Sequence, residues 1–527
     1  MSENKNGRNE DTLKTLPIGT YDFGKLRQRG HIYVDKTRRL VELITSGDWY
    51  FLSRPRRFGK SLTISTLEAM FRGQKELFKG LAAEAWVAEQ AEHPAPVLHL
   101  DMSMLDTIGV PQMEQTLSET LDRISGFQNI ELRSQSVSGK FQDIIAGLFR
   151  AGGPVVVLVD EYDKPILDSM EDLERADAIR ASLRTFYTVL KGCDKYLRFV
   201  MLTGISKFTK TGVFSAMNNL QDISVYRQYG DIVGYTQAEL EENFSGWIDK
   251  TAAGMNLDRR ELLKRVKDYY DGFCFDGETR LYNPFSILNF LAGQEFKNYW
   301  YSSGSPSFIA SYMKRHRIQD PEEYRHREVP PDFAEVQEIE RAAPESFLYQ
   351  SGYLTIEEKR EDSLVLDYPN YEVRSSLVRM YLDQVYHVRE YITLGGKLWK
   401  ALNEGDLEET VRLYNIALAG IPYSDFPNRD EGWYRSLFLM LLRGAGIPAA
   451  GEVPTSLGRS DALIQFPRRI VVLEFKYAKN GTGIKGLRQK GQSQIEEKGY
   501  ARPFDADGRE VTAAAIIIDG KRRAAVL

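Results

Sequence analysis

Hydrophobic residues in the first 300 positions fall into two alternating patterns. Short continuous apolar runs, rich in β-branched and aromatic residues, predict strands that are buried on both faces of a sheet. Longer stretches with helical spacing separate these runs. Strands that alternate with helices are typical of an α/β domain with a mostly parallel sheet. The predicted strands are residues 32–34, 49–53, 96–103, 155–160 and 197–203, and the predicted helices are 62–71, 112–124 and 176–190.

Helical spacing dominates the chain after residue 235. Residues 236–300 predict a helical lid, in which Asn283 caps a helix and Pro284 occupies its first turn. The region after residue 300 is mixed and largely helical, and we interpret its charged run 357–362 as a solvated turn or helix end. These patterns divide the chain into residues 15–235, 236–300, 301–425 and 426–527.

The last of these parts predicts a β-hairpin between two helices. Apolar strands at residues 458–466 and 470–476 flank a short turn. One helical pattern begins at Glu431, before the hairpin, and another covers residues 492–500. We therefore expect a second, smaller α/β domain at the C-terminus.

Composition excludes several classes of protein. A chain of 527 residues is too long for a single core and suggests about three domains. Hydrophobic residues at 42% and charged residues at 27% are ordinary for a globular protein. The two cysteines, Cys193 and Cys274, provide no disulfide framework and no metal-ligand spacing. Residues 1–12 have no apolar signal core, and no apolar run reaches the length of a membrane span, so we expect a cytoplasmic protein without a membrane partner.

Charge is distributed unevenly along the chain. The formal net charge is −5, but residues 431–527 contain 16 Lys and Arg against 10 Asp and Glu. A basic module on an acidic body predicts that the C-terminal part binds a polyanion such as DNA or RNA. A solvated basic face without a ligand is the alternative.

A candidate phosphate-binding loop follows the strand at residues 49–53. The loop ends in Gly59-Lys60-Ser61 and opens a helix, whose N-terminal N–H groups favour an anion. Lys60 can reach the β and γ oxygens of ATP, and the Ser61 hydroxyl can hold Mg²⁺. Arg54 stands where such a loop normally begins with glycine. The residues predicted to contact the nucleotide are Arg56, Arg57, Phe58, Gly59, Lys60, Ser61, Leu62, Asp160 and Thr203.

Two carboxylates end the apolar strand at residues 155–160. Asp160 is expected to hold Mg²⁺, and Glu161 to orient and deprotonate the attacking water. Thr203, at the end of the next strand, is a candidate for sensing the γ-phosphate, and Arg56 and Arg57 for contacting phosphates or a neighbouring subunit. The alternative is a buried strand with solvated acids, combined with a chance Gly-Lys-Ser.

The C-terminal hairpin carries a second candidate site. Glu474 and Lys476 share one face of their strand, and the pairing brings Asp461 beside them. The two carboxylates, Asp461 and Glu474, could hold a divalent metal, and the lysine could activate water or stabilise phosphate charge. A surface ion pair on a plain hairpin is the alternative.

Several motifs together resemble one family, the AAA-ATPase-like family of bacterial proteins, whose members carry the same arginine-containing loop. The tail, with Glu431, Asp461, Glu474 and Lys476, is similar to the PD-(D/E)xK nuclease domain that accompanies that family. The matching segments are Leu16-Pro17-Ile18-Gly19, Tyr33-Val34-Asp35-Lys36-Thr37, Arg54-Pro55-Arg56-Arg57-Phe58-Gly59-Lys60-Ser61, Val159-Asp160-Glu161-Tyr162-Asp163-Lys164-Pro165, Thr203-Gly204-Ile205-Ser206-Lys207 and Asn218-Asn219-Leu220-Gln221-Asp222.

The resemblance implies a P-loop domain of the AAA/ASCE kind with a helical lid, fused to a restriction-endonuclease-like α/β domain. The leading hypothesis is a Mg²⁺-dependent ATPase coupled to a metal-dependent nuclease-like domain that acts on or binds nucleic acid. One alternative is an ATP-dependent switch with an inactive tail that binds nucleic acid or a protein. Another is a scaffold whose phosphate loop binds no nucleotide. A homo-oligomer is left open.

Overall fold

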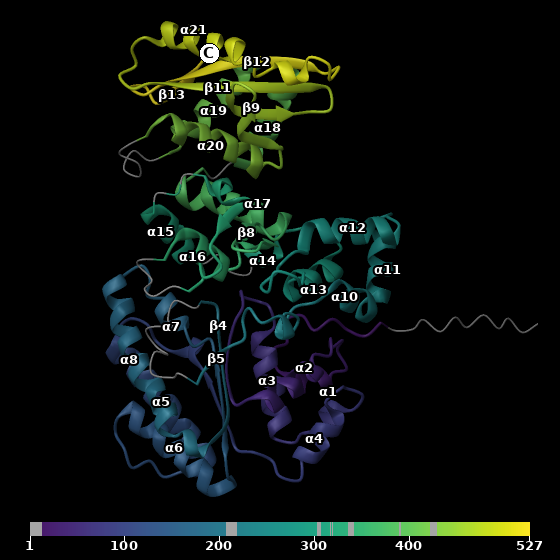
Figure 1. Ribbon diagram of the computed structural model, residues 1–527, viewed down its shortest axis with the longest axis vertical. Coiled ribbons are helices and arrows are strands. Elements are labelled where there is room, and N and C mark those ends of the chain that lie inside the picture. Colours follow the sequence, from purple (N-terminus) through teal and green to yellow (C-terminus); the bar gives the residue numbers. More distant parts are fainter. Residues whose placement is uncertain are drawn as a thin grey trace, which may run out of the picture. The chain divides into compact units, whose positions relative to one another are not determined.

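A computed structural model describes residues 13–206, 219–302, 307–316, 318, 320–335, 342–388, 391–421 and 429–527. The chain divides into two compact units (Figure 1). The first contains Met1–Gly304 and Tyr324–Val373, and the second contains Ser305–Glu323 and Arg374–Leu527. The region predicted as a separate connecting part, residues 301–425, is therefore shared between the two units.

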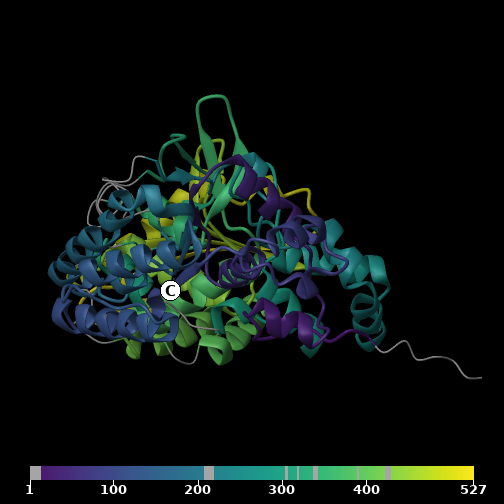
Figure 2. The same cartoon turned by 90° about the horizontal axis from the view of Figure 1, so that it is seen from below.

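The first unit is built on a five-stranded parallel sheet with the order β2-β3-β4-β1-β5. Helices cover both faces, with α5, α6 and α8 on one side and α1 to α4 on the other (Figures 1 and 2). The strands are β1 Trp49–Ser53, β2 Val97–Asp101, β3 Val155–Asp160, β4 Leu197–Gly204 and β5 Gln221–Asp222, and the helices are α1 Phe23–Gln28, α2 Thr37–Ser46, α3 Lys60–Phe71, α4 Glu84–Gln90, α5 Val110–Gln128, α6 Val137–Gly152, α7 Lys164–Leu167 and α8 Leu173–Gly192.

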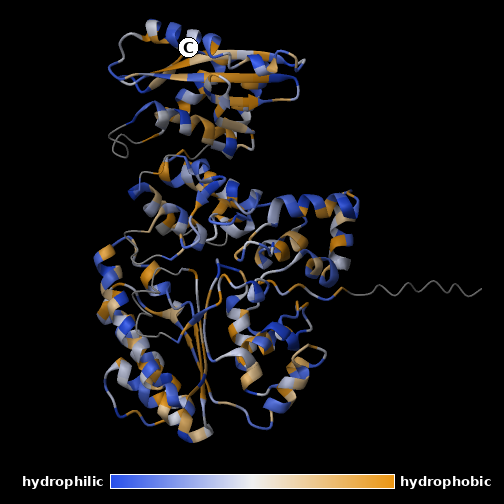
Figure 3. Cartoon of the chain, viewed as in Figure 1, coloured by the Kyte–Doolittle hydropathy of each residue, from blue (hydrophilic) through white to orange (hydrophobic). Residues whose placement is uncertain are grey.

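The four main predicted strands are confirmed, and the reason is burial. Every residue of β1 and β3 is buried, because helices shield both faces of the sheet. In Figure 3 the strands of this sheet are orange, while the flanking helices alternate between orange and blue. The three predicted helices are also present, each extended by two to four residues at one or both ends.

The lid region of the first unit is helical, as predicted, and Asn283 caps α13 by accepting from the backbone of Phe285 and Ser286. The strand predicted at residues 32–34 is wrong. Ile32 and Val34 instead pack into the core of the lid helices, which accounts for their alternating pattern. The lid helices are α10 Gln237–Asn243, α11 Ser245–Gly254, α12 Arg259–Tyr270, α13 Pro284–Gly293 and α14 Tyr299–Ser302.

A small antiparallel sheet completes the first unit, with the order β6-β8-β7. The charged run 357–362 is a solvated turn, the first of the two predicted alternatives, and not a helix end. It leaves β7 and turns into β8, so that its exposed charges lie at the tip of a hairpin. The elements are β6 Arg327–Val329, α16 Pro344–Gln350, β7 Thr355–Lys359 and β8 Leu364–Asp367.

The second unit contains a mixed sheet with the order β13-β12-β11-β10-β9. The predicted hairpin is confirmed as β10 and β11, but the helix predicted at 492–500 begins earlier and ends before Tyr500. Its strands are β9 Ala449–Thr455, β10 Gly458–Gln465, β11 Arg469–Ala478, β12 Glu510–Asp519 and β13 Ala524–Val526. Its helices include α15 Ser307–Arg315, α18 Tyr391–Glu404, α19 Leu407–Ala419, α20 Glu431–Gly444 and α21 Ile484–Glu497. A further helix, α17 Tyr371–Met380, begins in the first unit and continues into the second.

Two sequence-based expectations about the whole chain can be compared with the structure. Cys193 and Cys274 are both buried free thiols. Within the described ranges, no helix combines the length and the apolar character that crossing a membrane requires.

A buried carboxylate, Glu372, joins α13 to α14. It accepts hydrogen bonds from the Ser286 hydroxyl at 2.7 Å and the Trp300 backbone at 2.7 Å. Burial raises the pKa of Glu372 to about 7. Because the pKa is higher in the folded state, the folded protein binds this proton more tightly than the unfolded chain does. The contribution of Glu372 to the free energy of unfolding is therefore complete below about pH 4.5 and is lost as the pH rises through 7.

We therefore expect Glu372→Gln to remove this pH dependence. Glu372 should account for about 3 kcal/mol of the fall in the free energy of unfolding between pH 4.5 and pH 8, since each pKa unit is worth about 1.4 kcal/mol. The variant should show a flatter profile in urea unfolding at the same pH values. The exposed Glu131→Gln is the matched control, and an equally steep profile in Glu372→Gln would contradict the assignment.

Candidate functional site

The phosphate loop joins β1 to α3 at the carboxyl ends of the parallel strands. Gly59 precedes the helix with φ of 99°, a conformation that a residue with a side chain rarely adopts. Lys60 is the first residue of α3, so the unpaired N–H groups of its first turn are next to the lysine. This is the geometry in which a helix N-terminus binds an anion.

The Lys60 amine is held by the loop itself. Its Nζ donates to the backbone oxygens of Arg54 at 2.8 Å and Pro55 at 2.9 Å. Burial lowers the pKa of Lys60, and the nearby carboxylates of Asp160 and Glu161 oppose that change. The lysine and both acids line the same cavity, so the convergence that the sequence predicted between distant segments is present.

Arg54 explains why the loop lacks its first glycine. The side chain is only 1% exposed, and its Nη1 donates to the backbone oxygens of Ser53 at 2.9 Å and Ser224 at 2.6 Å. The guanidinium lies over the Phe275 ring at 4.3 Å, and burial lowers the pKa of Arg54 to about 10. Arg54 is therefore part of the core and not of the phosphate-binding surface.

The acidic end of β3 is organised by hydrogen bonds. Asp160 accepts from the Thr203 hydroxyl of β4 and from the backbone N–H of Glu161 at 3.0 Å. Glu161 has φ of 50°, and burial raises the pKa of its carboxyl. Asp101, which pairs with Asp160 across β2 and β3, also lines the cavity. Three carboxylates thus face the lysine at the carboxyl ends of parallel strands, where ligands of α/β sheets bind.

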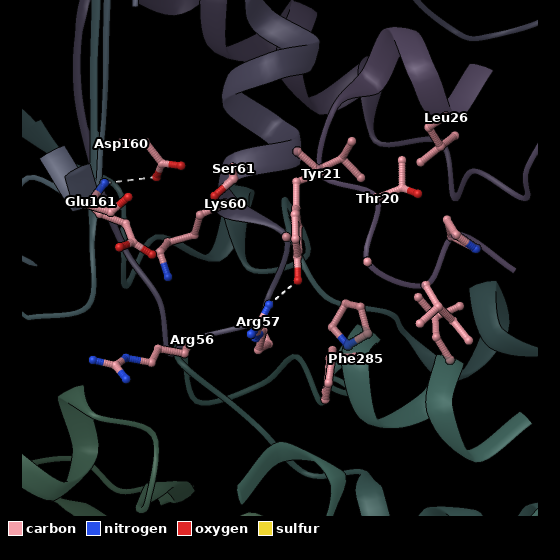
Figure 4. Close-up of a pocket in the computed structure, with 18 of the residues that line it drawn as sticks. Thr20, Tyr21, Leu26, Arg56, Arg57, Lys60, Ser61, Asp160, Glu161 and Phe285 are labelled. Carbon is pink, nitrogen blue, oxygen red and sulfur yellow. Dashed lines mark hydrogen bonds between the residues drawn. The ribbon is translucent and has the colours of Figure 1, made fainter. Parts of the chain in front are cut away.

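The cavity has a volume of about 410 Å³ and two chemically different ends (Figure 4). Lys60, Ser61, Asp160 and Glu161 gather at one end. The opposite end has an apolar wall made by distant segments, and a cation lies between the aromatic rings there: the Arg57 guanidinium is 5.6 Å from the Tyr21 ring and 5.1 Å from the Phe285 ring. Residues of this wall include Pro17, Ile18, Tyr21, Leu26, Pro284, Phe285 and Leu288.

The second candidate site lies on β10 and β11. Asp461 accepts from the Arg435 Nη1 of α20 at 2.9 Å and from the Phe475 backbone N–H at 2.7 Å. Lys476 Nζ donates to Glu474 Oε1 at 2.7 Å. The predicted cluster is therefore assembled, but an arginine already pairs with its aspartate.

Glu474 is the buried centre of this cluster. It is 2% exposed, and its Oε2 has no hydrogen-bond partner among the residues that the structure describes. Burial raises the pKa of Glu474 to about 7, with the Asp461 and Glu431 charges acting in the same direction. Burial also raises the pKa of Glu431, which Lys476 opposes. An unpartnered buried oxygen beside two further carboxylates fits a divalent cation, which would supply the missing positive charge.

The carboxylates of this cluster are nevertheless not drawn tightly together. Among the residues that the structure describes, a group whose ligand atoms all lie within 4.8 Å of one another is formed by His326, Glu357 and Asp367 instead. Arg325 donates to both oxygens of Asp367, at 3.2 and 3.1 Å, and balances its charge. That group therefore offers less to a cation than its composition suggests.

Comparisons with known proteins match the two parts of the chain that contain these candidate sites. A family model described as "Predicted AAA-ATPase" matches residues 17–214, and one described as "PD-(D/E)XK nuclease superfamily" matches residues 429–526. An "Uncharacterized protein in vnfD 5'region" of Azotobacter chroococcum mcd 1 is 34% identical over 516 residues, which cover 94% of this chain and 95% of that protein. The chain belongs to the AAA-ATPase-like family. The resemblance inferred from the motifs is thereby confirmed, and so is its nuclease-superfamily tail.

Two solved structures from Aeropyrum pernix were also matched by this AAA-ATPase-like protein. The ORC1 protein in complex with DNA shares 12% identity over 81% of this chain and 87% of that chain, with a TM-score of 0.26. The ORC2 protein, described as ADPNP-ADP complexes, shares 13% identity over 84% and 90%, with a TM-score of 0.29. Scores this low carry no inference about function.

Several predicted residues of the AAA-ATPase-like domain occupy places that only the fold reveals. Phe58 is buried and packs against Phe273 and Phe275 at 4.9 and 5.5 Å between ring centroids. Its side chain belongs to the core, so only its backbone is available to a nucleotide. Thr203 is buried and reaches the cavity only through Asp160. Arg56, Arg57, Gly59, Lys60, Ser61 and Leu62 line the cavity, and the motif residues Lys207 and Asn218 lie outside the described residues.

Besides the predicted roles of Asp160 and Glu161, the acidic motif contains a structural aspartate, Asp163, that sequence reasoning missed. The buried Asp163 accepts from the backbone N–H groups of Ile205 at 3.0 Å and Ser206 at 2.7 Å, and from the Ser206 hydroxyl at 2.7 Å. Asp163 thus ties the residues after β3 to the end of β4. Its place three residues after Asp160 in the matching motif was the available signal.

Proposed function

We propose that this AAA-ATPase-like protein binds and hydrolyses Mg-ATP and couples that cycle to a metal-dependent nuclease-like domain that acts on nucleic acid. One observation carries the proposal. Lys60, Asp160 and Glu161, from distant segments, line one end of a cavity whose other end is apolar. Such a cavity suits a triphosphate at the charged end and a nucleoside at the other.

Each residue of the charged end has a defined task in this proposal. Lys60 exchanges its bonds with the Arg54 and Pro55 carbonyls for bonds to the β and γ oxygens. Ser61 and Asp160 hold Mg²⁺, whose charge offsets that of the phosphates. Glu161 accepts the proton of the attacking water, and its raised pKa brings it closer to the working pH of a general base.

Residues around this end refine the same proposal. Thr203 orients Asp160 and acts on the γ-phosphate through it. Arg56 and Arg57 contact phosphate oxygens, which suit a planar guanidinium. Arg57 must then leave the position between Tyr21 and Phe285 that it occupies here.

In the C-terminal domain, Glu431, Asp461 and Glu474 would hold a divalent metal that activates water and neutralises phosphate charge. Lys476 would orient that water or stabilise the developing charge. This part of the proposal requires Arg435 to release Asp461.

The Arg435 contact also favours a second candidate function, an ATP-dependent switch. Both oxygens of Asp461 already have protein partners, one from Arg435 and one from the backbone of Phe475. If these contacts persist, the tail binds nucleic acid or a protein without cutting. The scaffold alternative, in which the loop binds no nucleotide, is tested together with ATP binding.

We expect Mg-ATP to stabilise the wild-type protein and not the Lys60→Ala variant. A ligand at a hundred times its dissociation constant stabilises the native state by about 2.7 kcal/mol, which raises the melting temperature by several degrees. Differential scanning fluorimetry with and without Mg-ATP measures this shift. Lys140→Ala, which removes an ion pair with Asp122 between α6 and α5, is the control and should keep the shift. Equal melting temperatures for the wild type in both conditions would support the scaffold.

We expect purified protein to nick supercoiled plasmid DNA in Mg²⁺ or Mn²⁺, because in this proposal the lysine and three acids would hold the metal and act on the phosphate. Asp461→Ala and Lys476→Ala should each lower the rate at least about ten-fold, since each removes a group that acts on the reacting phosphate. Lys479→Ala is the control, because Lys479 is an exposed lysine directly after β11, the strand that carries Lys476. No cutting in either metal with ATP present would favour the switch, and cutting that survives both variants would contradict the site.

A further inference from the structure

The second unit has a cavity that the candidate nuclease site does not use. It has a volume of about 490 Å³ and lies where the end of α18 meets the turn between β10 and β11. Asp461 is five residues from that turn, so the two places are roughly 16 Å apart at about 3.3 Å per strand residue. The lining residues are Trp399, Asn403, Pro467, Arg468, Arg469 and Glu510.

Trp399 provides an accessible aromatic surface in this cavity. Its side chain is 44% exposed, although tryptophan usually buries most of its area. The Phe466 ring meets it edge-on, with centroids 5.9 Å apart and planes at 84°. An indole that is braced by one perpendicular ring and is still 44% exposed is suited to stacking on another planar group.

The floor of the cavity is held in place because each of the three guanidinium nitrogens of Arg469 donates a hydrogen bond. Its Nε donates to the Asn403 backbone oxygen at 3.0 Å, Nη1 to the Thr512 hydroxyl at 2.6 Å and Nη2 to Glu510. Gly405 has φ of 77°, and a Cβ there would lie 2.4 Å from Arg469 Nη1. The guanidinium thus fastens α18 to the sheet, and the Glu510 carboxylate balances its charge.

Arg468 supplies positive charge at the rim. It is exposed in the turn, next to the fastened Arg469, and Lys400 is exposed on α18 immediately after Trp399. Residues 431–527 carry the basic excess noted above, so the surroundings also favour an anionic ligand. An aromatic face beside a cation matches the two parts of a nucleotide, the base and the phosphate.

We propose that this cavity binds single-stranded nucleic acid, with a base stacked on Trp399 and an adjacent phosphate at Arg468. Only an unpaired base exposes its face to a side chain, so a single strand is preferred over an intact duplex. This inference rests on the proposed nucleic-acid role of the tail and adds the form of the ligand and the residues that hold it. Because the cavity lies at the other end of the hairpin, it would hold the strand away from the reacting phosphate.

The test uses the full chain and a fluorescein-labelled oligothymidylate in EDTA, so that binding is measured without cleavage. Trp399→Ala should weaken binding about five- to a hundred-fold, the range found for removing one stacking partner. Trp399→Phe should retain most of the affinity, since it keeps an aromatic face. Arg468→Ala should weaken binding and lower the slope of log K against log salt by about 0.7. Ile392→Ala, an exposed residue of the same helix at 63%, is the matched control.

Each outcome decides the inference. Trp399-dependent binding of the single strand, with weaker binding of a blunt duplex, supports it. Single-strand binding that is unchanged in Trp399→Ala and Arg468→Ala overturns the cavity while leaving the proposed function intact. Failure of the wild type to bind any oligonucleotide, with ATP stabilisation preserved, overturns the inference and the nucleic-acid part of the proposed function together. A wild-type melting temperature in Trp399→Ala and in Arg468→Ala excludes misfolding as the cause of weaker binding.

Discussion

Glu161→Gln is expected to lower ATP turnover by two to four orders of magnitude while leaving nucleotide binding nearly unchanged. The amide has the shape of the carboxylate but cannot accept a proton, and general-base catalysis typically contributes about 10²- to 10⁴-fold. Burial raises the pKa of Glu161, and the carboxylate lies beside Lys60 in the same cavity. Phosphate release in a coupled assay measures turnover, and the Mg-ATP melting shift measures binding.

The matched control for this change is Glu171→Gln, an exposed glutamate ten residues further along the chain, which should turn over ATP as the wild type does. Wild-type ATP turnover in Glu161→Gln would show that Glu161 is not the general base. Loss of both turnover and the melting shift would instead indicate that Glu161 is needed to bind Mg-ATP.

Arg54→Gly is expected to destabilise the first unit by about 3–5 kcal/mol, although it restores the glycine with which such loops usually begin. The substitution leaves the backbone oxygens of Ser53 and Ser224 without their buried donor and opens a cavity beside Phe275. Urea unfolding followed by circular dichroism measures the loss.

Arg29→Gly, at an exposed helix end, is the control and should cost less than about 1 kcal/mol. An Arg54→Gly protein as stable as the wild type, with improved ATP binding, would show that Arg54 belongs to the phosphate site after all.

Elements with a strong local signal were predictable from the sequence. β1, β3 and the part of β4 after Arg198 are mainly apolar because both faces of the sheet are covered, and burial of that kind is visible in the sequence. Gly59, Lys60 and Asp160 could be chosen as candidate site residues because binding a magnesium-bound triphosphate permits few other residue types at these positions. In contrast, Ile32 and Val34 alternate like a strand but pack as extended chain against the lid helices, so their pattern alone could not decide between the two.

Contacts between distant segments that belong to no recognisable motif were not predictable. The aromatic wall joins Tyr21, before the sheet, to Phe285, far beyond it, and only the folded chain brings them to Arg57. The same holds for the Arg435 contact with Asp461, which joins a helix to a strand and changes what the predicted metal site can do. Spacing within a motif carries no information about a partner that enters from elsewhere.

The wall that contains Pro17, Ile18 and Tyr21 has a practical consequence for handling this protein. A trimmed version beginning after residue 21 would keep the complete phosphate loop and both acids of β3, yet one side of the nucleoside end would be gone. Such a shortened protein would fold around an intact sheet and still bind ATP weakly. Weak nucleotide affinity in a truncated preparation would then report the missing segment, and not a defect of the loop.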